Sequence, residues 1–430
     1  MNISIDALYN IYQKHPLIIT DSRKVVPGCL FFALKGENFD GNIFARQAVH
    51  NGAAYAVSDD PANEAENIII VENVLSTLQK LASVHRDHLH IPVIGITGTN
   101  GKTTTKELAF TVLSSHFQTH ATPGNFNNHL GVPLTILSAP AETEMLIVEM
   151  GANHVGEIAG LCRIAKPTHG LITNIGRAHL EGFGGYEGVI KAKSELYNYL
   201  ADNEGHAFVN GDNSQLINLT AGIGRTTYGA SELLDSQGSI TASDPFLNVK
   251  VTIGRVEFEI STSLIGQYNF ENVMASVCIG NYFKVPAEKI VKAIAEYKPG
   301  NSRSQAVDTG KNTVIADFYN ANPSSMKAAL ENFGHFKAGK KMVILGDMFE
   351  LGNESYAEHM AIVKLVEQMQ FEKAIFAGPG FMKAAAGSSF TCFMNSSEVY
   401  ELLLKECPRD YTILLKGSRG SRMENVLPAL

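Results

Sequence analysis

Short apolar runs alternate with stretches of helical spacing along most of this chain. Apolar residues that follow one another over a few positions, bounded by turn residues, predict buried strands. Such runs lie at residues 145–149, 170–174, 313–318, 341–345, 373–377 and 411–416. Between them, apolar residues three and four positions apart predict helices at residues 155–164, 186–200, 270–282 and 287–297. Strands that alternate with helices predict parallel sheets covered on both faces, so we expect an α/β fold.

Breaks in this pattern predict three domains. The first part of the chain has short predicted elements, which are strands at 16–20, 29–34 and 53–58 and helices at 42–51 and 74–85. We therefore expect a small α/β domain over residues 1–88. A turn-rich segment at 298–302 sets the second boundary, so the central domain spans residues 89–300 and includes a β-hairpin around Gly254. Residues 301–430 are expected to form a Rossmann-like, doubly wound domain.

A glycine-rich turn between a predicted strand and a predicted helix is the clearest chemical signal. Backbone N–H groups in such a turn and the positive end of the following helix bind phosphates. Lys102 is placed to neutralise the β- and γ-phosphates, and the Thr103 hydroxyl to bind Mg²⁺. A strict P-loop has glycine where Ile96 stands, so this is a variant, and the alternative is a glycine-rich turn that merely contains lysine. The turn consists of Gly98, Thr99, Asn100, Gly101, Lys102, Thr103 and Thr104.

Other polar residues of the central domain lie at strand ends or on helices. Glu149 ends a strand, where an acid is placed to hold Mg²⁺, although a solvent-exposed strand end is the alternative. His179 follows another strand, and its spacing leaves a phosphate or metal contact and a structural role equally open. On spacing alone Lys193 is an ordinary surface residue of a helix. Asn269 and Asn272 share a helix face and suit a base or ribose, unless Asn269 is only a cap.

Three polar turns follow strands of the last domain. The turn after the first strand is acidic and amide-rich, and a helix is expected to begin there at Pro323. The turn after the last strand is basic and suits an anion such as a carboxylate. Three such turns at one edge of one sheet predict a cleft. Its candidate residues are Asp317, Asn320, Asn322, Asp347, Ser418, Arg419 and Ser421.

Composition excludes several classes of protein. The net charge of −8 argues against a protein that binds nucleic acid by general electrostatics. The five cysteines form no C-x-x-C pair, which argues against a disulfide framework or a zinc site. The first residues lack the features of a signal peptide, and no apolar run approaches the roughly 20 residues of a membrane span. We therefore expect a cytoplasmic protein that does not insert into membranes.

These motifs, in this order, resemble the ATP-dependent Mur ligases of peptidoglycan synthesis over the whole chain. The P-loop variant is the form found in that family, and the Asp-Asn-Pro-Arg motif of its diaminopimelate-adding branch is absent. The strongest resemblance is to the branch that adds D-alanyl-D-alanine to UDP-N-acetylmuramoyl-tripeptide. It rests on residues 20–23, 27–36, 122–128, 131–135, 319–323, 325–326, 345–348, 350–352 and 416–420.

The resemblance implies roles for individual residues. Lys193 falls where the family has a carbamylated lysine, whose carboxylate would share a second Mg²⁺ with His179. Thr103 and Glu149 would hold the first Mg²⁺, and with Lys102 these residues form the expected catalytic centre. The implied ATP contacts outside the P-loop are Asn269, Asn272, Arg303 and Asp317. The implied contacts with the UDP-sugar are Ser22 and Arg23. Asn127 and Asn128 match a substrate-facing loop of the central domain. The implied contacts with the dipeptide are Asn320, Asn322, Asp347 and residues 418–421.

The implied reaction begins with phosphorylation of the tripeptide carboxylate by ATP, followed by attack of the dipeptide amine on the acyl phosphate. We expect a monomer whose central and C-terminal domains close about the turn at 298–302. One alternative is a sister ligase of folyl-polyglutamate or cyanophycin type, and another is a nucleotide-binding module without ligase activity. The third residue of the tripeptide (diaminopimelate or lysine) and the base for the amine stay open, and residues 231–245 match no motif.

Overall fold

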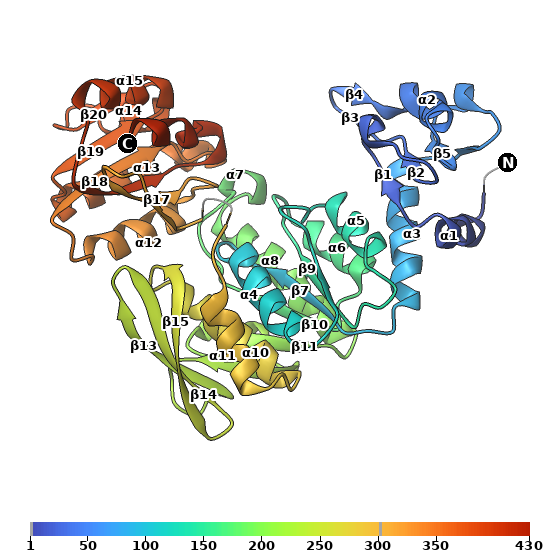
Figure 1. The fold of residues 1–430 in the computed structure, drawn as a ribbon, viewed down its shortest axis with the longest axis horizontal. Helices are drawn as coiled ribbons and strands as arrows, with labels where there is room; N and C mark the ends of the chain where they lie inside the picture. The colour runs from blue at the N-terminus through green and yellow to red at the C-terminus, as the bar shows by residue number, and fades with distance from the viewer. Residues whose placement is uncertain (1–2, 301–302) are drawn as a thin grey trace.

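The computed structural model describes residues 3–300 and 303–430, which fold around three main sheets. We call them the N-terminal, central and C-terminal sheets. Figure 1 shows the N-terminal sheet and the C-terminal sheet on opposite sides of the central one. The predicted α/β fold is confirmed, since helices alternate with parallel strands in all three parts. No described helix is long and apolar enough to cross a membrane.

The N-terminal sheet has four parallel strands in the order β1-β2-β5-β6. Its strands are β1 (Ile18–Ile19), β2 (Leu30–Phe32), β5 (Tyr55–Ser58) and β6 (Ile68–Ile70). A separate two-stranded pair joins β3 (Lys35–Gly36) to β4 (Phe39–Asp40). The helices of this part are α1 (Ile5–Lys14), α2 (Ala45–His50) and α3 (Val74–His88). The helix expected at 42–51 is in part a 3-10 turn, Gly41–Phe44, which Asp40 caps.

The central sheet has nine strands in the order β15-β14-β13-β12-β11-β10-β7-β9-β8. Parallel pairing runs from β8 to β13, and β13, β14 and β15 pair antiparallel. Its strands are β7 (Val93–Thr97), β8 (Thr119–Ala121), β9 (Met145–Glu149), β10 (His169–Ile172), β11 (His206–Asn210), β12 (Gly224–Gly229), β13 (Ser236–Ser243), β14 (Phe246–Ile253) and β15 (Val256–Ile265). The hairpin expected around Gly254 is confirmed as β14–β15, and β13 occupies most of the segment that matched no motif.

Eight helices accompany the central sheet in the described part of the chain. They are α4 (Lys102–Ser114), α5 (Gly131–Leu137), α6 (Glu157–Ala165), α7 (Leu180–Phe183), α8 (Tyr186–Asp202), α9 (Ser214–Leu219), α10 (Asn269–Tyr282) and α11 (Ala287–Glu296). Helix α10 packs on α4, so the helix that follows the P-loop is covered by a buried partner. The boundary predicted at 298–302 lies partly outside the described residues, and the three domain limits stay predictions.

The C-terminal sheet has six strands in the order β16-β17-β21-β18-β19-β20, of which only the edge strand β16 is antiparallel. Its strands are β16 (Gln305–Asp308), β17 (Thr313–Asp317), β18 (Lys340–Gly346), β19 (Lys373–Ala377), β20 (Thr391–Phe393) and β21 (Tyr411–Lys416). Its helices are α12 (Pro323–Gly334), α13 (Ser355–Met369), α14 (Pro379–Ala384) and α15 (Ser396–Glu406). Helix α12 begins at Pro323 as predicted, with a capping box between Asn322 and Ser325.

Candidate active site

A cavity of about 1000 Å³ opens at the carboxyl ends of the central strands and extends to the C-terminal sheet. Open α/β sheets bind ligands at this edge. Many of the predicted site residues line it. They are Thr99, Asn100, Gly101, Lys102, Thr103, Thr104, Asn127, Asn128, Glu149, His179, Asn269, Asn272, Arg303, Asp317, Asn320 and Asn322. The predicted residues outside its lining are Gly98, Lys193, Ser22, Arg23, Asp347, Ser418, Arg419 and Ser421.

The P-loop connects β7 to α4 in a conformation that needs glycine. Gly98 and Gly101 have φ angles of 142° and 80°, in the left-handed region. A Cβ on Gly98 would lie 2.0 Å from the Thr173 hydroxyl oxygen, so even alanine would clash there. The loop is also tied to the end of β10, because the Thr173 hydroxyl donates to the Asn100 carbonyl at 2.6 Å and the Asn100 N–H donates to Asn174 Oδ1 at 3.0 Å. The turn is thus fixed before a ligand arrives.

Lys102 folds over this loop. Its Nζ donates to the carbonyl of Gly98 at 2.8 Å and to that of Thr99 at 3.0 Å. Burial lowers the pKa of Lys102 to about 8, partly opposed by the nearby Glu149 carboxylate. A phosphate placed in the loop would give this ammonium the negative partner that burial demands.

Glu149 meets the requirements for a cation ligand. It ends β9, and its side chain is only 1% exposed, so the solvent-exposed alternative is wrong. Asn127 Nδ2 donates to Oε1 at 2.7 Å, whereas Oε2 is buried with no hydrogen-bond partner among the described residues. A buried carboxylate oxygen without a partner is costly unless a ligand completes it. Thr103 lines the same cavity, so the two residues and the phosphates fit a Mg²⁺ ion.

Lys193 is buried, and its surface interpretation is therefore wrong. It lies on α8 with 2% of its surface exposed, and its Nζ is 5.4 Å from the centre of the Phe183 ring. Burial, followed by the like charge of Lys102, lowers the pKa of Lys193 to about 7. Both effects favour the neutral form of the Lys193 amine.

His179 approaches the cavity from the turn after β10. It has a φ of 51°, and its Nδ1 pairs with the carboxylate of Glu350, which follows β18. This pair lowers the pKa of Glu350. Among residues 3–300 and 303–430, no three or more His, Cys, Asp or Glu side chains are grouped so that they could hold a metal ion.

Asn269 and Asn272 lie on one face of the first turn of α10, as predicted. Asn272 Nδ2 donates to Asn269 Oδ1 at 2.8 Å, and the Thr105 hydroxyl donates to Asn272 Oδ1 at 2.9 Å. Asn269 Nδ2 donates to the Ile265 carbonyl, while Tyr268 occupies the cap position, so the interpretation of Asn269 as a cap is wrong. The two amides connect the P-loop helix to α10 beside the cavity.

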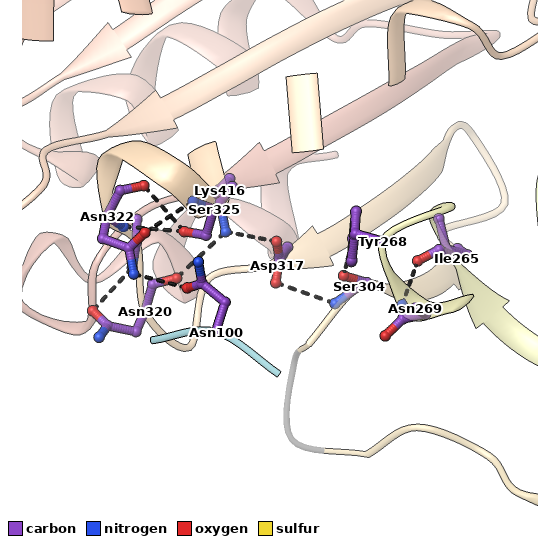
Figure 2. A network of polar contacts seen from close by, with 11 residues as sticks. Asn100, Ile265, Tyr268, Asn269, Ser304, Asp317, Asn320, Asn322, Ser325 and Lys416 are labelled. Carbon is purple, nitrogen blue, oxygen red and sulfur yellow. Dashed lines mark hydrogen bonds and ion pairs between the residues drawn. The ribbon is translucent and has the colours of Figure 1, made fainter. Parts of the chain in front are cut away.

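The C-terminal side of the cavity is organised by an acid and a lysine (Figure 2). Lys416 Nζ, at the end of β21, donates to Asp317 Oδ2 at 2.6 Å, and Lys416 is 2% exposed. The Ser304 N–H donates to Asp317 Oδ1 at 3.2 Å. The Arg303 guanidinium lies 3.9 Å from the centre of the Tyr319 ring. Lys416 was absent from the predicted site, although its position at a strand end is the same signal that identified Glu149.

In the other two polar turns of this sheet, the predicted side chains form hydrogen bonds within the C-terminal part of the chain. The Asp347 carboxylate is 4% exposed and accepts the N–H groups of Gly380 and Phe381 at 2.8 Å each. The Ser418 hydroxyl donates to the Asp347 carbonyl, and the Ser421 hydroxyl donates to the Ser418 carbonyl. Of the three turns expected in one cleft, the structure brings the one after β17 to the cavity, together with Lys416 from the third.

Two further pairs of predicted residues have local partners. Ser22 and Arg23 form a 3-10 turn whose Arg23 guanidinium binds the Asp21 carboxylate, away from the cavity lining. Asn128 lines the cavity, but its side-chain oxygen accepts the N–H groups of Leu130 and Gly131 at the start of α5. Their contact with a substrate stays a prediction.

Contacts across the cavity join the central and C-terminal sheets. Asn322 Nδ2 donates to Asn100 Oδ1 at 2.9 Å, which connects α12 to the P-loop (Figure 2). The Arg177 guanidinium pairs with the carboxylates of Glu354 and Glu358. We call these contacts of Asn322 and Arg177 the intersheet contacts. They hold the two sides of the cavity close together.

Comparisons with known proteins agree with this geometry. The chain matches three sequence models, described as the Mur ligase family catalytic domain (residues 17–97), the Mur ligase middle domain (96–280) and the Mur ligase glutamate ligase domain (302–419). A UDP-N-acetylmuramoyl-tripeptide–D-alanyl-D-alanine ligase of Bacillus subtilis (strain 168) is 34% identical over 428 residues, which cover 96% of this chain and 92% of the relative.

Two solved structures have the same fold over nearly the whole chain. MurF from Acinetobacter baumannii superposes with a TM-score of 0.89 at 30% identity, covering 99% of this chain and 98% of that one. MurF from Thermotoga maritima, solved in complex with ADP, superposes with a TM-score of 0.85 at 26% identity, covering 97% of each chain.

Proposed function

Because the chain belongs to the Mur ligase family, we propose that it is an ATP-dependent ligase that joins D-alanyl-D-alanine to UDP-N-acetylmuramoyl-tripeptide. The products are UDP-N-acetylmuramoyl-pentapeptide, ADP and phosphate, and the step belongs to cytoplasmic synthesis of peptidoglycan precursors. One observation carries the proposal: a relative that bears this activity in its name is similar over 96% of the chain. The cavity beside the P-loop is the place for the reaction.

ATP binds in this proposal with its phosphates on the P-loop. Lys102 and the loop N–H groups bind the phosphates, since the amides and the helix terminus face an anion there. Asn269, Asn272, Arg303 and Asp317 surround the rest of the nucleotide, and all four line the cavity.

Magnesium is the cation that this donor set suits, because oxygen ligands are hard donors. Glu149 and Thr103 would hold the first ion, and the unpaired Oε2 of Glu149 supports that assignment. His179 and a carbamylated Lys193 would hold a second. Bound there, Mg²⁺ supplies positive charge that offsets the repulsion between two approaching anions. Burial and the lowered pKa of Lys193 support carbamylation, because carbon dioxide adds to the neutral amine.

The chemistry requires a carboxylate to become an acyl donor. The tripeptide carboxylate attacks the γ-phosphate of ATP and forms an acyl phosphate, and the neutral amine of the dipeptide then displaces phosphate. Lys102 and the P-loop amides stabilise the charge on the transferred phosphoryl group. Water would hydrolyse the acyl phosphate, so the C-terminal sheet must cover the cavity during the reaction. The intersheet contacts support such a covered arrangement.

The dipeptide approaches in this proposal from the C-terminal side, beside Asn320 and Asn322, which line the cavity. Asp347 and the turn from Ser418 to Ser421 act indirectly, by fixing the strand ends behind that surface. Ser22 and Arg23 are assigned to the UDP-sugar end, and Asn127 and Asn128 to the tripeptide. The expectation of a monomer stays a prediction.

The test is phosphate release with ATP, Mg²⁺ and UDP-N-acetylmuramoyl-tripeptide, with and without D-alanyl-D-alanine. We expect release only when both substrates are present, together with a pentapeptide product by mass spectrometry. Release that requires a different acceptor would indicate a sister ligase. Hydrolysis of ATP at the same rate with and without any acceptor would indicate a nucleotide-binding module without ligase activity.

A further inference from the structure

Lys106 is a buried lysine that the proposed mechanism does not use. It lies on α4, four residues after Lys102, and is 3% exposed. Its Nζ donates to the carbonyl of Thr122 at 2.9 Å and to that of Gly124 at 3.4 Å. Its ion pair with Glu107 is long, at 3.9 Å, so the two carbonyls are its nearest partners. Burial of an ammonium is costly unless it is hydrogen-bonded, so we expect the hydrogen bonds of Lys106 to have a structural or functional role.

The carbonyls that Lys106 binds belong to the segment that surrounds Glu149. The Glu149 N–H donates to the Thr122 hydroxyl at 2.9 Å. At the other end of the segment, Asn127 Nδ2 donates to Glu149 Oε1 at 2.7 Å, and the Asn127 carbonyl accepts the Gly151 N–H at 2.7 Å. Residues 122–127 therefore fix the backbone of Glu149 and one of its carboxylate oxygens, and leave Oε2 unpaired.

Helix α4 carries both Lys102, which lies over the P-loop, and Lys106, which binds residues 122–127. Residues four apart on a helix lie on one face, so Lys102 and Lys106 leave α4 in neighbouring directions. Lys102 turns back over the P-loop, and Lys106 holds the segment that orients Glu149. One rigid element thus sets the position of the phosphate-binding ammonium relative to the cation-binding carboxylate.

We propose that Lys106 is a positioning residue that orients Glu149 through residues 122–127 and thereby sets the affinity of the site for a divalent cation. The proposal rests on the proposed function in one respect, that Glu149 binds the cation beside the nucleotide. Residues that orient metal ligands typically affect metal affinity by about 10- to 100-fold. Lys106 does not touch the ligand itself, since it lies outside the cavity lining.

The test measures cation binding without turnover. Mn²⁺, which prefers the same oxygen ligands, is titrated by electron paramagnetic resonance in the presence of a non-hydrolysable ATP analogue. We expect Lys106→Met to weaken Mn²⁺ binding by about 10-fold or more, and Lys106→Arg to restore part of it. Affinity for the analogue without metal is expected to change little. Lys289→Met is the matched control, because its Nζ also donates to a carbonyl, that of Ser115 at 2.8 Å, with no connection to Glu149.

A second variant keeps the test decisive if Lys106→Met does not fold. Thr122→Val removes the hydroxyl that accepts the Glu149 N–H and leaves Lys106 with its carbonyls. It is expected to weaken Mn²⁺ binding as well, and the double variant is expected to lose less than the product of the two single effects. Mn²⁺ affinity like that of the wild type in Lys106→Met, or in Thr122→Val, would overturn the proposal. Loss of thermal stability alone would do the same.

The outcome is separable from that of the ligase assay. If D-alanyl-D-alanine does not stimulate phosphate release, the proposed function is wrong. Weaker Mn²⁺ binding in Lys106→Met would still support the role of Lys106. Conversely, unchanged Mn²⁺ binding in a working ligase would remove only the role of Lys106.

Discussion

The two edges of the central sheet are built for different purposes, although the same strands form both. At the carboxyl edge, β7, β9 and β10 lead to buried polar groups without full sets of partners, such as Glu149 Oε2. At the amino edge, the rings at the starts of β10 and β11 pack with Tyr282 at the end of α10. His206 stacks on Tyr282 with ring centroids 4.7 Å apart, and its Nε2 lies 2.8 Å from the Thr226 hydroxyl. His169 Nδ1 likewise lies 2.9 Å from the Thr168 hydroxyl.

This difference separates groups that stabilise the protein from groups that are held for a ligand. Unpaired buried polar atoms lower stability, and they persist where a ligand completes them. Paired rings at the opposite edge contribute packing without chemistry. Substitutions at the carboxyl edge should therefore change activity more than stability, and substitutions at the amino edge should do the reverse.

The largest effect is expected from Lys102→Ala at the carboxyl edge. Loss of one electrostatic group of this kind typically lowers the rate by about 10²–10³-fold, and we expect turnover to be nearly abolished. Thermal unfolding should change little, because within residues 3–300 and 303–430 the lysine donates only to carbonyls of its own loop. The measurement is phosphate release with both substrates, beside a melting curve. A large loss of stability in this variant would contradict the distinction between the two edges of the central sheet.

Lys193→Ala is the second variant, and it also should nearly abolish turnover. If the residue acts as a carbamate, a short-chain carboxylate added to the assay should restore part of the activity, because it supplies the missing anion. Full activity of the variant without any addition would refute carbamylation. The Lys191→Ala variant, at an exposed position of the same helix, is the control and should keep its activity.

Arg177→Ala tests the intersheet contacts, with a smaller expected effect. Exposed ion pairs contribute about 0–1 kcal/mol each, so we expect the apparent KM to rise about two- to five-fold at low salt. The difference between variant and wild type should shrink at high salt, since salt screens the pairs of Arg177 with Glu354 and Glu358. Lys327→Ala, which removes an exposed pair with Glu331 within α12, is the control and should leave KM unchanged.

His169→Phe should leave activity unchanged and alter only the pH dependence of stability. Burial, followed by the charge of His206, lowers the pKa of His169 to about 4, below its usual value of 6.5. The unfolded chain therefore binds the proton more tightly, so stability is complete above pH 6.5 and falls as the pH drops toward 4. The loss near pH 5 should be on the order of 1–2 kcal/mol. Urea unfolding at pH 7.5 and pH 5 measures the free energy of unfolding. Its decrease between the two pH values should be smaller in His169→Phe than in the control His335→Phe.

The sequence predicted the positions of strand ends well, and this is why Glu149 and Asp317 were found. It could not predict which of the side chains at strand ends are hydrogen-bonded to nearby backbone N–H groups. Asp347 has the same position relative to its strand, yet its carboxylate caps α14. A helical position likewise gives no measure of burial, so Lys193 was identified only through the family resemblance. Strand β13 was not predicted because half of its residues are exposed, only one is buried, and no apolar run marks it.

The bonds between Lys102 and the carbonyls of its own loop also bear on which ligands the site accepts. A ligand that occupies the loop must offer the ammonium better acceptors than Gly98 and Thr99 already do. A phosphate chain does so, because charged acceptors form stronger hydrogen bonds than neutral ones. Adenosine, which lacks phosphates, would leave both bonds in place and gain nothing from Lys102. Discrimination between a nucleoside and its triphosphate thus begins with the loop's own carbonyl groups.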